Sequence, residues 1–149
     1  MDLEHTEQMT DAAPTLEELK KSAGRMSNWR ERLKAVEALG EAGGQPVTDL
    51  LSRIAQNDPV HQVQLAAHRA AVKLGAELEA PARKTGELIK GTGKILLRIK
   101  KSLPAGHDYQ AFKEKLKHMR TDVYDTYEGD KEAEFDQWLE QKWSSLSGR

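Results

Sequence analysis

Residues 57–75 read NDPVHQVQLAAHRAAVKLG, and this stretch decides the fold. Asn57, Asp58 and Pro59 supply in succession a predicted turn, an N-cap and a first-turn proline. Small and aliphatic residues then recur at helical spacing until Gly75, which ends the pattern: Val63, Ala67, Ala70, Ala71 and Leu74. The stretch predicts a helix whose small residues allow a second helix to approach closely.

An earlier segment has the same spacing, at an offset of 32 residues. Arg32, Ala35, Ala38, Leu39, Ala42 and Gly43 correspond to Gln64, Ala67, Ala70, Ala71, Leu74 and Gly75. Each segment follows a polar cap residue, Asn28 in the first and Asp58 in the second. Stacking of helix pairs into a solenoid requires small residues at this spacing. The alternative is an ordinary Ala-rich helical bundle whose two helices match by chance.

The two segments, ERLKAVEALGEAG at 31–43 and the stretch at 57–75, resemble the HEAT-like repeats of the phycobilin-lyase type. The resemblance covers about residues 28–80. Glu31 stands where the family usually has an aliphatic residue, and Gln64 stands where it usually has Arg. The resemblance implies a short α-solenoid that acts in protein–protein interaction. Because the family also includes chromophore-lyase subunits, it implies more weakly a role beside an enzyme.

Capping signals predict further helix boundaries. Thr15-Leu-Glu-Glu18 is a capping box that starts a helix ending near Ala23. Pro46 fits the first turn of a helix that follows Gly43-Gly44. Four apolar side chains continue that helix: Val47, Leu50, Leu51 and Ile54.

The second half predicts longer elements. Pro81 to Lys101 is expected to be one long helix with a break or kink near 91–93, where glycines interrupt it. Asp108 is the expected N-cap of a helix whose apolar face is Tyr109, Phe112, Leu116 and Met119. An acidic connection from Thr121 to Gly129 should follow, with Asp130 as the N-cap of the last helix.

The predicted fold is therefore all-α, since no alternating β-branched run is long enough for a strand. We expect a short α-solenoid of about two HEAT-like repeats with a non-repeat helical C-terminal cap. Residues 1–14 are expected to be a disordered tail, 15–80 a capping helix plus the repeats, and 81–149 a basic, aromatic-rich region packed on them as one domain. Seven of the eight aromatic residues lie between 109 and 143.

Charge is segregated along the 149 residues although the net charge is only −1. Residues 1–19 contain six acids and no base, 82–120 contain eleven bases and three acids, and 121–149 contain eight acids and three bases. The predicted partner-binding residues lie in register on two successive helices: Lys90, Lys94, Arg98, Lys101, Lys113, Lys117 and Arg120. A protein with an acidic surface is the expected partner. The alternatives are nucleic acid bound through 82–120 and the chain's own acidic segments, 1–19 and 121–140.

No catalytic, cofactor-binding or metal-binding residue is predicted, and no small-molecule substrate. The absence of Cys excludes disulfides, thiolate zinc sites and cysteine nucleophiles. Gly91-Thr-Gly-Lys94 lacks the remaining positions of a phosphate loop, and His61 and His68 lack a third metal ligand. His107 and His118 show no partner, and the acid pairs Asp122/Asp125 and Glu132/Glu134 are expected on a charged surface without an apolar pocket. Because no segment approaches 18 apolar residues and the start is acidic and polar, we expect a cytoplasmic protein without a membrane span.

Overall fold

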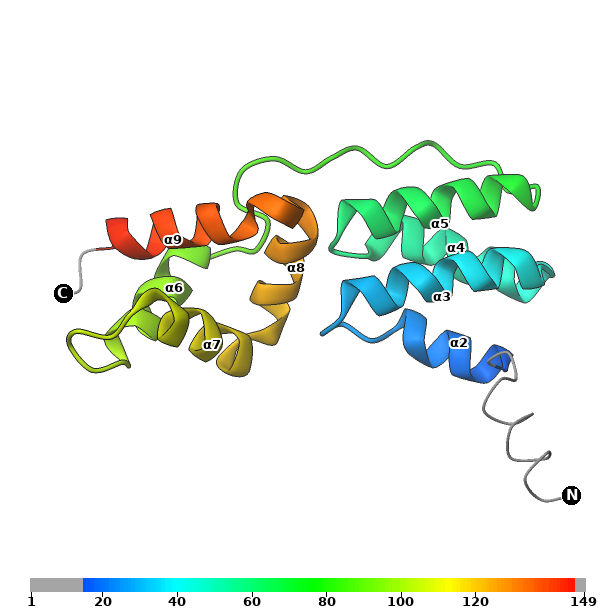
Figure 1. The fold of residues 1–149 in the computed structure, drawn as a ribbon. Helices are drawn as coiled ribbons and strands as arrows, with labels where there is room; N and C mark the ends of the chain where they lie inside the picture. Colours follow the sequence, from blue (N-terminus) through cyan, green and yellow to red (C-terminus); the bar gives the residue numbers. More distant parts are fainter. Residues whose placement is uncertain (1–14, 147–149) are drawn as a thin grey trace, which may run out of the picture.

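The computed structural model describes residues 15–146, and within this range all regular structure is helical (Figure 1). The elements are α2 (Leu16–Ala23), α3 (Trp29–Ala42), α4 (Gln45–Asn57), α5 (His61–Lys73), α6 (Thr92–Lys101), α7 (Tyr109–Met119), α8 (Thr121–Lys131), the 3-10 turn η1 (Glu132–Glu134) and α9 (Phe135–Ser145). The prediction of an all-α fold is confirmed. The predicted disordered tail, 1–14, lies outside the described residues.

Side-chain caps begin three helices at the predicted residues. The Thr15 hydroxyl accepts the Glu18 N–H at 3.1 Å, while the Glu18 carboxylate accepts the Thr15 N–H at 2.8 Å, so the capping box of α2 is complete. Asn28 and Asp108 accept a first-turn N–H in α3 and α7. Pro46 lies in the first turn of α4, as predicted.

The start of α5 differs from the prediction. This helix begins at His61, so Asp58 is not its N-cap and Pro59 is not in its first turn. The Asp58 carboxylate instead accepts the Val60 N–H at 2.8 Å and forms an ion pair with the buried Arg32 of α3. An ion pair across the fold therefore takes precedence over the local capping pattern.

Helices α2 to α5 share one hydrophobic core. Helix α3 packs against both α2 and α5, and α4 packs against α5. The side chains of Leu39, Leu51 and Val63 are fully buried in this core. The two helices that carry the repeated segments, α3 and α5, lie side by side (Figure 1).

Helices α6 to α9 surround a second core, which contains the seven aromatic side chains of residues 109–143. The Tyr127 ring stacks on Trp138 with centroids 4.5 Å apart, and Phe112 is fully buried. Met119 was predicted on this apolar face, but 57% of its surface is exposed because it ends α7 beyond the packed turns.

The acidic segment after α7 is a buried helix, not the predicted connection. Helix α8 spans Thr121–Lys131, so Asp130 lies in its last turn and is not the N-cap of α9. Val123 and Tyr127 of α8 enter the second core, while the opposite side of α8 contacts α3 and α5. Because α8 is buried on two sides, its sequence lacks the one-sided periodicity by which a helix is recognised.

The predicted long helix over 81–101 is also wrong in its first half, because only Thr92–Lys101 is helical. Gly86 and Gly91 adopt φ values of +77° and +81°, which do not occur inside a right-handed helix. Gly91 is the N-cap of α6, so the predicted break is the start of the helix. The segment upstream runs without regular structure along α5 and joins the two halves of the molecule (Figure 1).

Candidate functional site

Four of the seven predicted partner-binding residues belong to α6 or to the turn before it. Lys94, Arg98 and Lys101 are spaced four and three residues apart, so they share one face of α6. This face is opposite Leu96 and Ile99, which are buried in the second core. All three cations and Lys90 are exposed, and none forms an ion pair with another residue of the described range. We call Lys90, Lys94, Arg98 and Lys101 the α6 basic face.

The other three predicted residues, on α7 and at its end, are engaged by neighbouring groups. The ammonium group of Lys113 lies 2.6 Å from the carboxylate of Asp136, and Arg120 forms a two-bond pair with Asp122. These cations lower the pKa values of the Asp136 and Asp122 carboxyls, the second through hydrogen bonds from the guanidinium. Lys117 is exposed, with its ammonium group 5.4 Å from the centre of the Tyr124 ring. Among these seven described residues, the cations that are free to bind a partner therefore lie mainly on α6 and in the turn before it.

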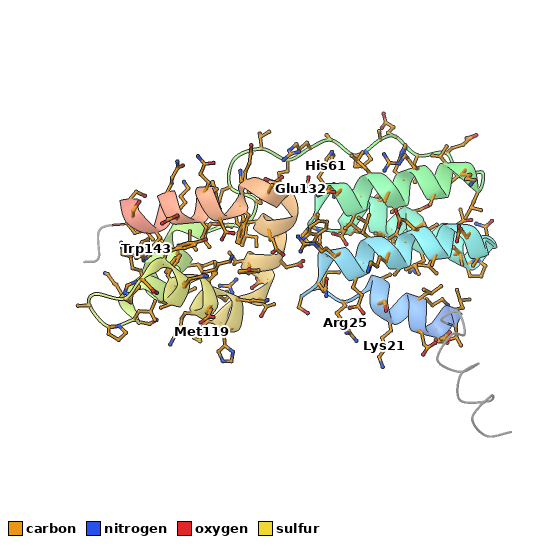
Figure 2. All side chains as sticks on the ribbon, viewed as in Figure 1. Lys21, Arg25, His61, Met119, Glu132 and Trp143 are labelled. Carbon is orange, nitrogen blue, oxygen red and sulfur yellow. The ribbon has the colours of Figure 1, made fainter. Side chains whose placement is uncertain are left out.

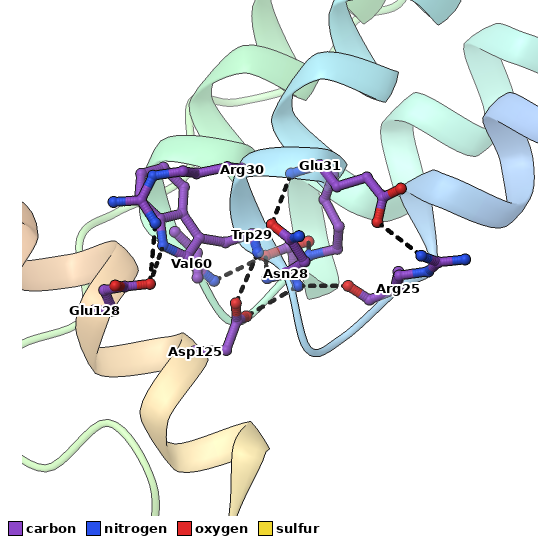
Figure 3. Close-up of polar contacts among 10 residues, drawn as sticks. Arg25, Asn28, Trp29, Arg30, Glu31, Val60, Asp125 and Glu128 are labelled. Atoms are coloured by element: carbon purple, nitrogen blue, oxygen red, sulfur yellow. Dashed lines mark hydrogen bonds and ion pairs between the residues drawn. The ribbon is translucent and has the colours of Figure 1, made fainter. Parts of the chain in front are cut away.

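A buried ionic cluster joins the two halves of the molecule (Figure 3). Arg32 of α3 is fully buried, and its Nε and second guanidinium nitrogen donate to the Asp58 carboxylate at 2.8 and 3.2 Å. Its remaining guanidinium nitrogen donates to the Arg25 carbonyl at 2.8 Å and lies 2.9 Å from Oδ2 of Asp125. The other oxygen of Asp125 accepts the Trp29 N–H at 2.7 Å. One arginine thus links the start of α3, the α4–α5 turn and α8.

Burial and charge act in opposite directions within this cluster. Burial raises the pKa of Asp125, and the neighbouring Arg32 guanidinium only partly offsets that increase. Burial also tends to lower the pKa of Arg32, but the two carboxylates more than compensate and the net change is an increase. Asp125 was predicted on a charged surface without an apolar pocket, and that prediction is wrong because only 2% of the residue is exposed.

Further contacts surround the cluster where α8 meets α3 and α5. The Trp29 indole N–H and the Arg30 guanidinium donate to Glu128 at 3.3 and 3.0 Å, and the Gln62 amide donates to the Gly129 carbonyl at 2.9 Å. Because both carboxylates of the cluster are held by backbone N–H groups and by arginine, the geometry fits a structural cross-link. The sequence carried one signal for it, because Arg32 is the one charged residue among the six matched positions of the first repeated segment.

Several other polar residues that the sequence singled out also have structural partners. The His68 side chain donates to the Leu78 carbonyl at 3.0 Å, and Gln64, at the position where Arg is usual in the resembling repeats, donates to the Asp58 carbonyl at 2.8 Å. His107 was predicted to lack a partner, but its Nε2 accepts the Trp143 indole N–H at 2.9 Å. Among residues 15–146, His, Asp and Glu side chains nowhere gather in a group of three or more that could hold a metal ion.

No helix in the described part of the chain has both the length and the apolar character needed to cross a membrane. Comparison with family models, curated proteins and solved structures found no significant match to this chain.

Proposed function

We propose that this chain is a non-enzymatic interaction module, built from about two HEAT-like repeats and a helical cap, that binds a protein partner with an acidic surface through the α6 basic face. The observation that carries the proposal is the exposure of Lys94, Arg98 and Lys101 on one side of α6 without internal ion pairs among the described residues. The side-by-side packing of α3 and α5 supports the repeat architecture, which presents an extended surface for partners.

The arrangement of these cations suits a complementary surface. At a rise of 1.5 Å per residue, Lys94 and Arg98 are about 6 Å apart along the helix axis, and Lys101 lies about 4.5 Å further on. Such a row can pair with a matching row of carboxylates, which gives specificity and a faster encounter with the partner. Lys113 and Arg120 contribute less because Asp136 and Asp122 already neutralise them.

Nucleic acid is the second candidate ligand, since the same cations can neutralise phosphates. Binding of this kind would lack base stacking by the aromatic residues of α7. Phe112 is fully buried, and the Tyr109 hydroxyl donates to Asp136 at 2.8 Å. For this reason we favour a protein partner.

The test is affinity capture from a lysate of the source organism with the wild-type chain and with Lys94→Glu/Arg98→Glu. The matched control is Lys34→Glu/Lys73→Glu, which reverses the same number of exposed charges on α3 and α5. We expect the captured protein to be lost only with the α6 variant, while circular dichroism shows all three chains folded. Unchanged capture by the α6 variant would refute the proposal. Loss of capture after nuclease treatment would favour nucleic acid.

A further inference from the structure

We propose that the groove between α2 and α4 is a second binding site, which takes a short acidic peptide segment of a partner protein and buries one large apolar side chain of it. The groove has a volume of about 200 Å³. Its apolar lining includes Ala23 of α2, Met26 of the following turn, and Leu50 and Ile54 of α4. It is more apolar than the two hollows lined by Asn57 with Leu88 and by Ala55 with Leu78.

The groove exists because α2 is short. Helix α2 ends after eight residues at Ala23, whereas α4 continues for 13 residues, and both lie beside α3. On this side the second half of α4 faces the last turn of α2 and the turn that follows it, and Leu50 remains only half-buried. Met26, in the turn after α2, has 50% of its surface exposed. A flexible, exposed Met at the edge of an apolar groove can repack around an incoming side chain.

Two cations lie on opposite walls of the groove, and the one carboxylate in its lining, that of Asp58, is already paired with the buried Arg32. Lys20 projects from α2 and Arg53 from α4. Arg53 has no ion-pair partner in the described chain, and Lys20 has only a long contact of 3.8 Å to Glu17. Lys21 and Arg25 project into solvent beside the end of α2 (Figure 2), although Arg25 is paired with Glu31. An apolar floor between two cations fits an apolar side chain flanked by carboxylates.

The size of the groove indicates a side chain and not a small molecule. Its 200 Å³ is below the range of about 300–1,000 Å³ that is usual for small-molecule sites. A leucine or phenylalanine side chain fits this space, and its burial would supply the affinity while the flanking acids fix the direction of the segment. The groove is lined by residues beside the first core, whereas the α6 basic face lies on the second core, so the two sites share no residue.

The probe is a fluorescein-labelled peptide, Glu-Asp-Glu-Leu-Glu-Asp-Glu, whose binding to the full chain is followed by fluorescence anisotropy. Two matched peptides carry Ser in place of Leu or Lys in place of every acid. We expect the acidic Leu peptide to bind, and each control peptide to bind about tenfold more weakly or worse. No binding of the acidic Leu peptide at about 1 mM would overturn the proposal, as would equal binding of all three peptides.

Protein variants locate the site. Arg53→Glu and Met26→Ser change exposed side chains, and each should weaken binding about tenfold or more. Lys34→Glu/Lys73→Glu and Lys94→Glu/Arg98→Glu should bind the peptide like the wild type, and the second of these separates this site from the α6 basic face. Loss of binding with the α6 variant, or wild-type binding by both groove variants, would overturn the proposal.

The chain's own acidic start is the competing occupant. Neutralising its acids, Asp2, Glu4, Glu7 and Asp11, should leave the affinity for the peptide unchanged if the groove serves a partner. Clearly tighter binding of the peptide by this variant would assign the groove to the chain's own N-terminal residues and overturn the assignment to a partner.

Discussion

Gly129 of α8 is the residue whose substitution best tests how closely the two halves approach. A Cβ atom built at this position would lie 2.7 and 2.8 Å from the two methyl groups of Val60 and 3.1 Å from Cγ of Trp29. Ordinary contacts between carbon atoms are about 3.5–4.0 Å. Gly129→Ala therefore forces α8 away from the N-terminal ends of α3 and α5, or forces Val60 out of its buried position.

Two effects of opposite sign set the magnitude. Ala in place of Gly inside a helix stabilises by about 1 kcal/mol, whereas overpacking of a close contact costs about 1–3 kcal/mol. Gly93 of α6 provides the matched control because a Cβ there meets no atom within 4 Å. Gly93→Ala should show only the favourable effect. The free energies of unfolding of the two variants should therefore differ by about 1–3 kcal/mol, with Gly129→Ala the less stable.

The assay is urea unfolding followed by tryptophan fluorescence and by circular dichroism, because the three tryptophans report on both cores. Val60→Ala removes the two methyl groups that clash, so Gly129→Ala should cost much less stability in that background. The reasoning fails if Gly129→Ala stabilises as much as Gly93→Ala. It also fails if the cost of Gly129→Ala is the same with Ala as with Val at position 60.

Two further substitutions give defined expectations. Burial raises the pKa of Asp125 in the folded state above its value in the unfolded chain. The free energy of unfolding of the wild type should therefore fall relative to that of Asp125→Asn as the pH rises from about 4 through the folded pKa. Urea unfolding at several pH values measures this difference. A difference that does not vary with pH would argue against a raised pKa. Glu132 has a φ of +53°, so Glu132→Gly should stabilise the protein by about 0.5–1 kcal/mol. Glu134 has a φ of −90°, so the control Glu134→Gly should destabilise it by a similar amount. Thermal melts measure both changes. Equal effects at both positions would show that Glu132 is unstrained.

The helix caps could be predicted from the sequence because each depends on residues three positions apart. Thr15 with Glu18 and Asn28 with Glu31 are examples in which a short spacing determines the hydrogen bond. Asp58 shows the limit of this reasoning. The sequence around Asp58 has the pattern of an N-cap, but in the fold its carboxylate accepts hydrogen bonds from Arg32, which lies 26 residues away.

Part of the candidate surface was also predictable, because it depends on residues that are close together along one helix. Lys94 and Arg98 could be placed on one exposed face because α6 is amphipathic over its whole length. The engagement of Lys113 depends on Asp136 of α9, and the sequence alone does not bring those two helices together. Helix α8 was missed because its two buried sides cancel the periodic pattern.

The junction between α8 and α3 connects residues that are 96 to 99 positions apart, from Trp29 and Arg30 to Asp125 and Glu128. Closing so long a loop carries a large entropic cost, and a chain made from its N-terminus has its first core complete before α8 is synthesised. During that interval Asp58 alone neutralises Arg32, while the backbone N–H of Trp29 is open to water. We therefore expect α8 to dock after the first core has folded, and a ribosome-bound chain that stops before residue 121 exposes a surface that the finished protein buries.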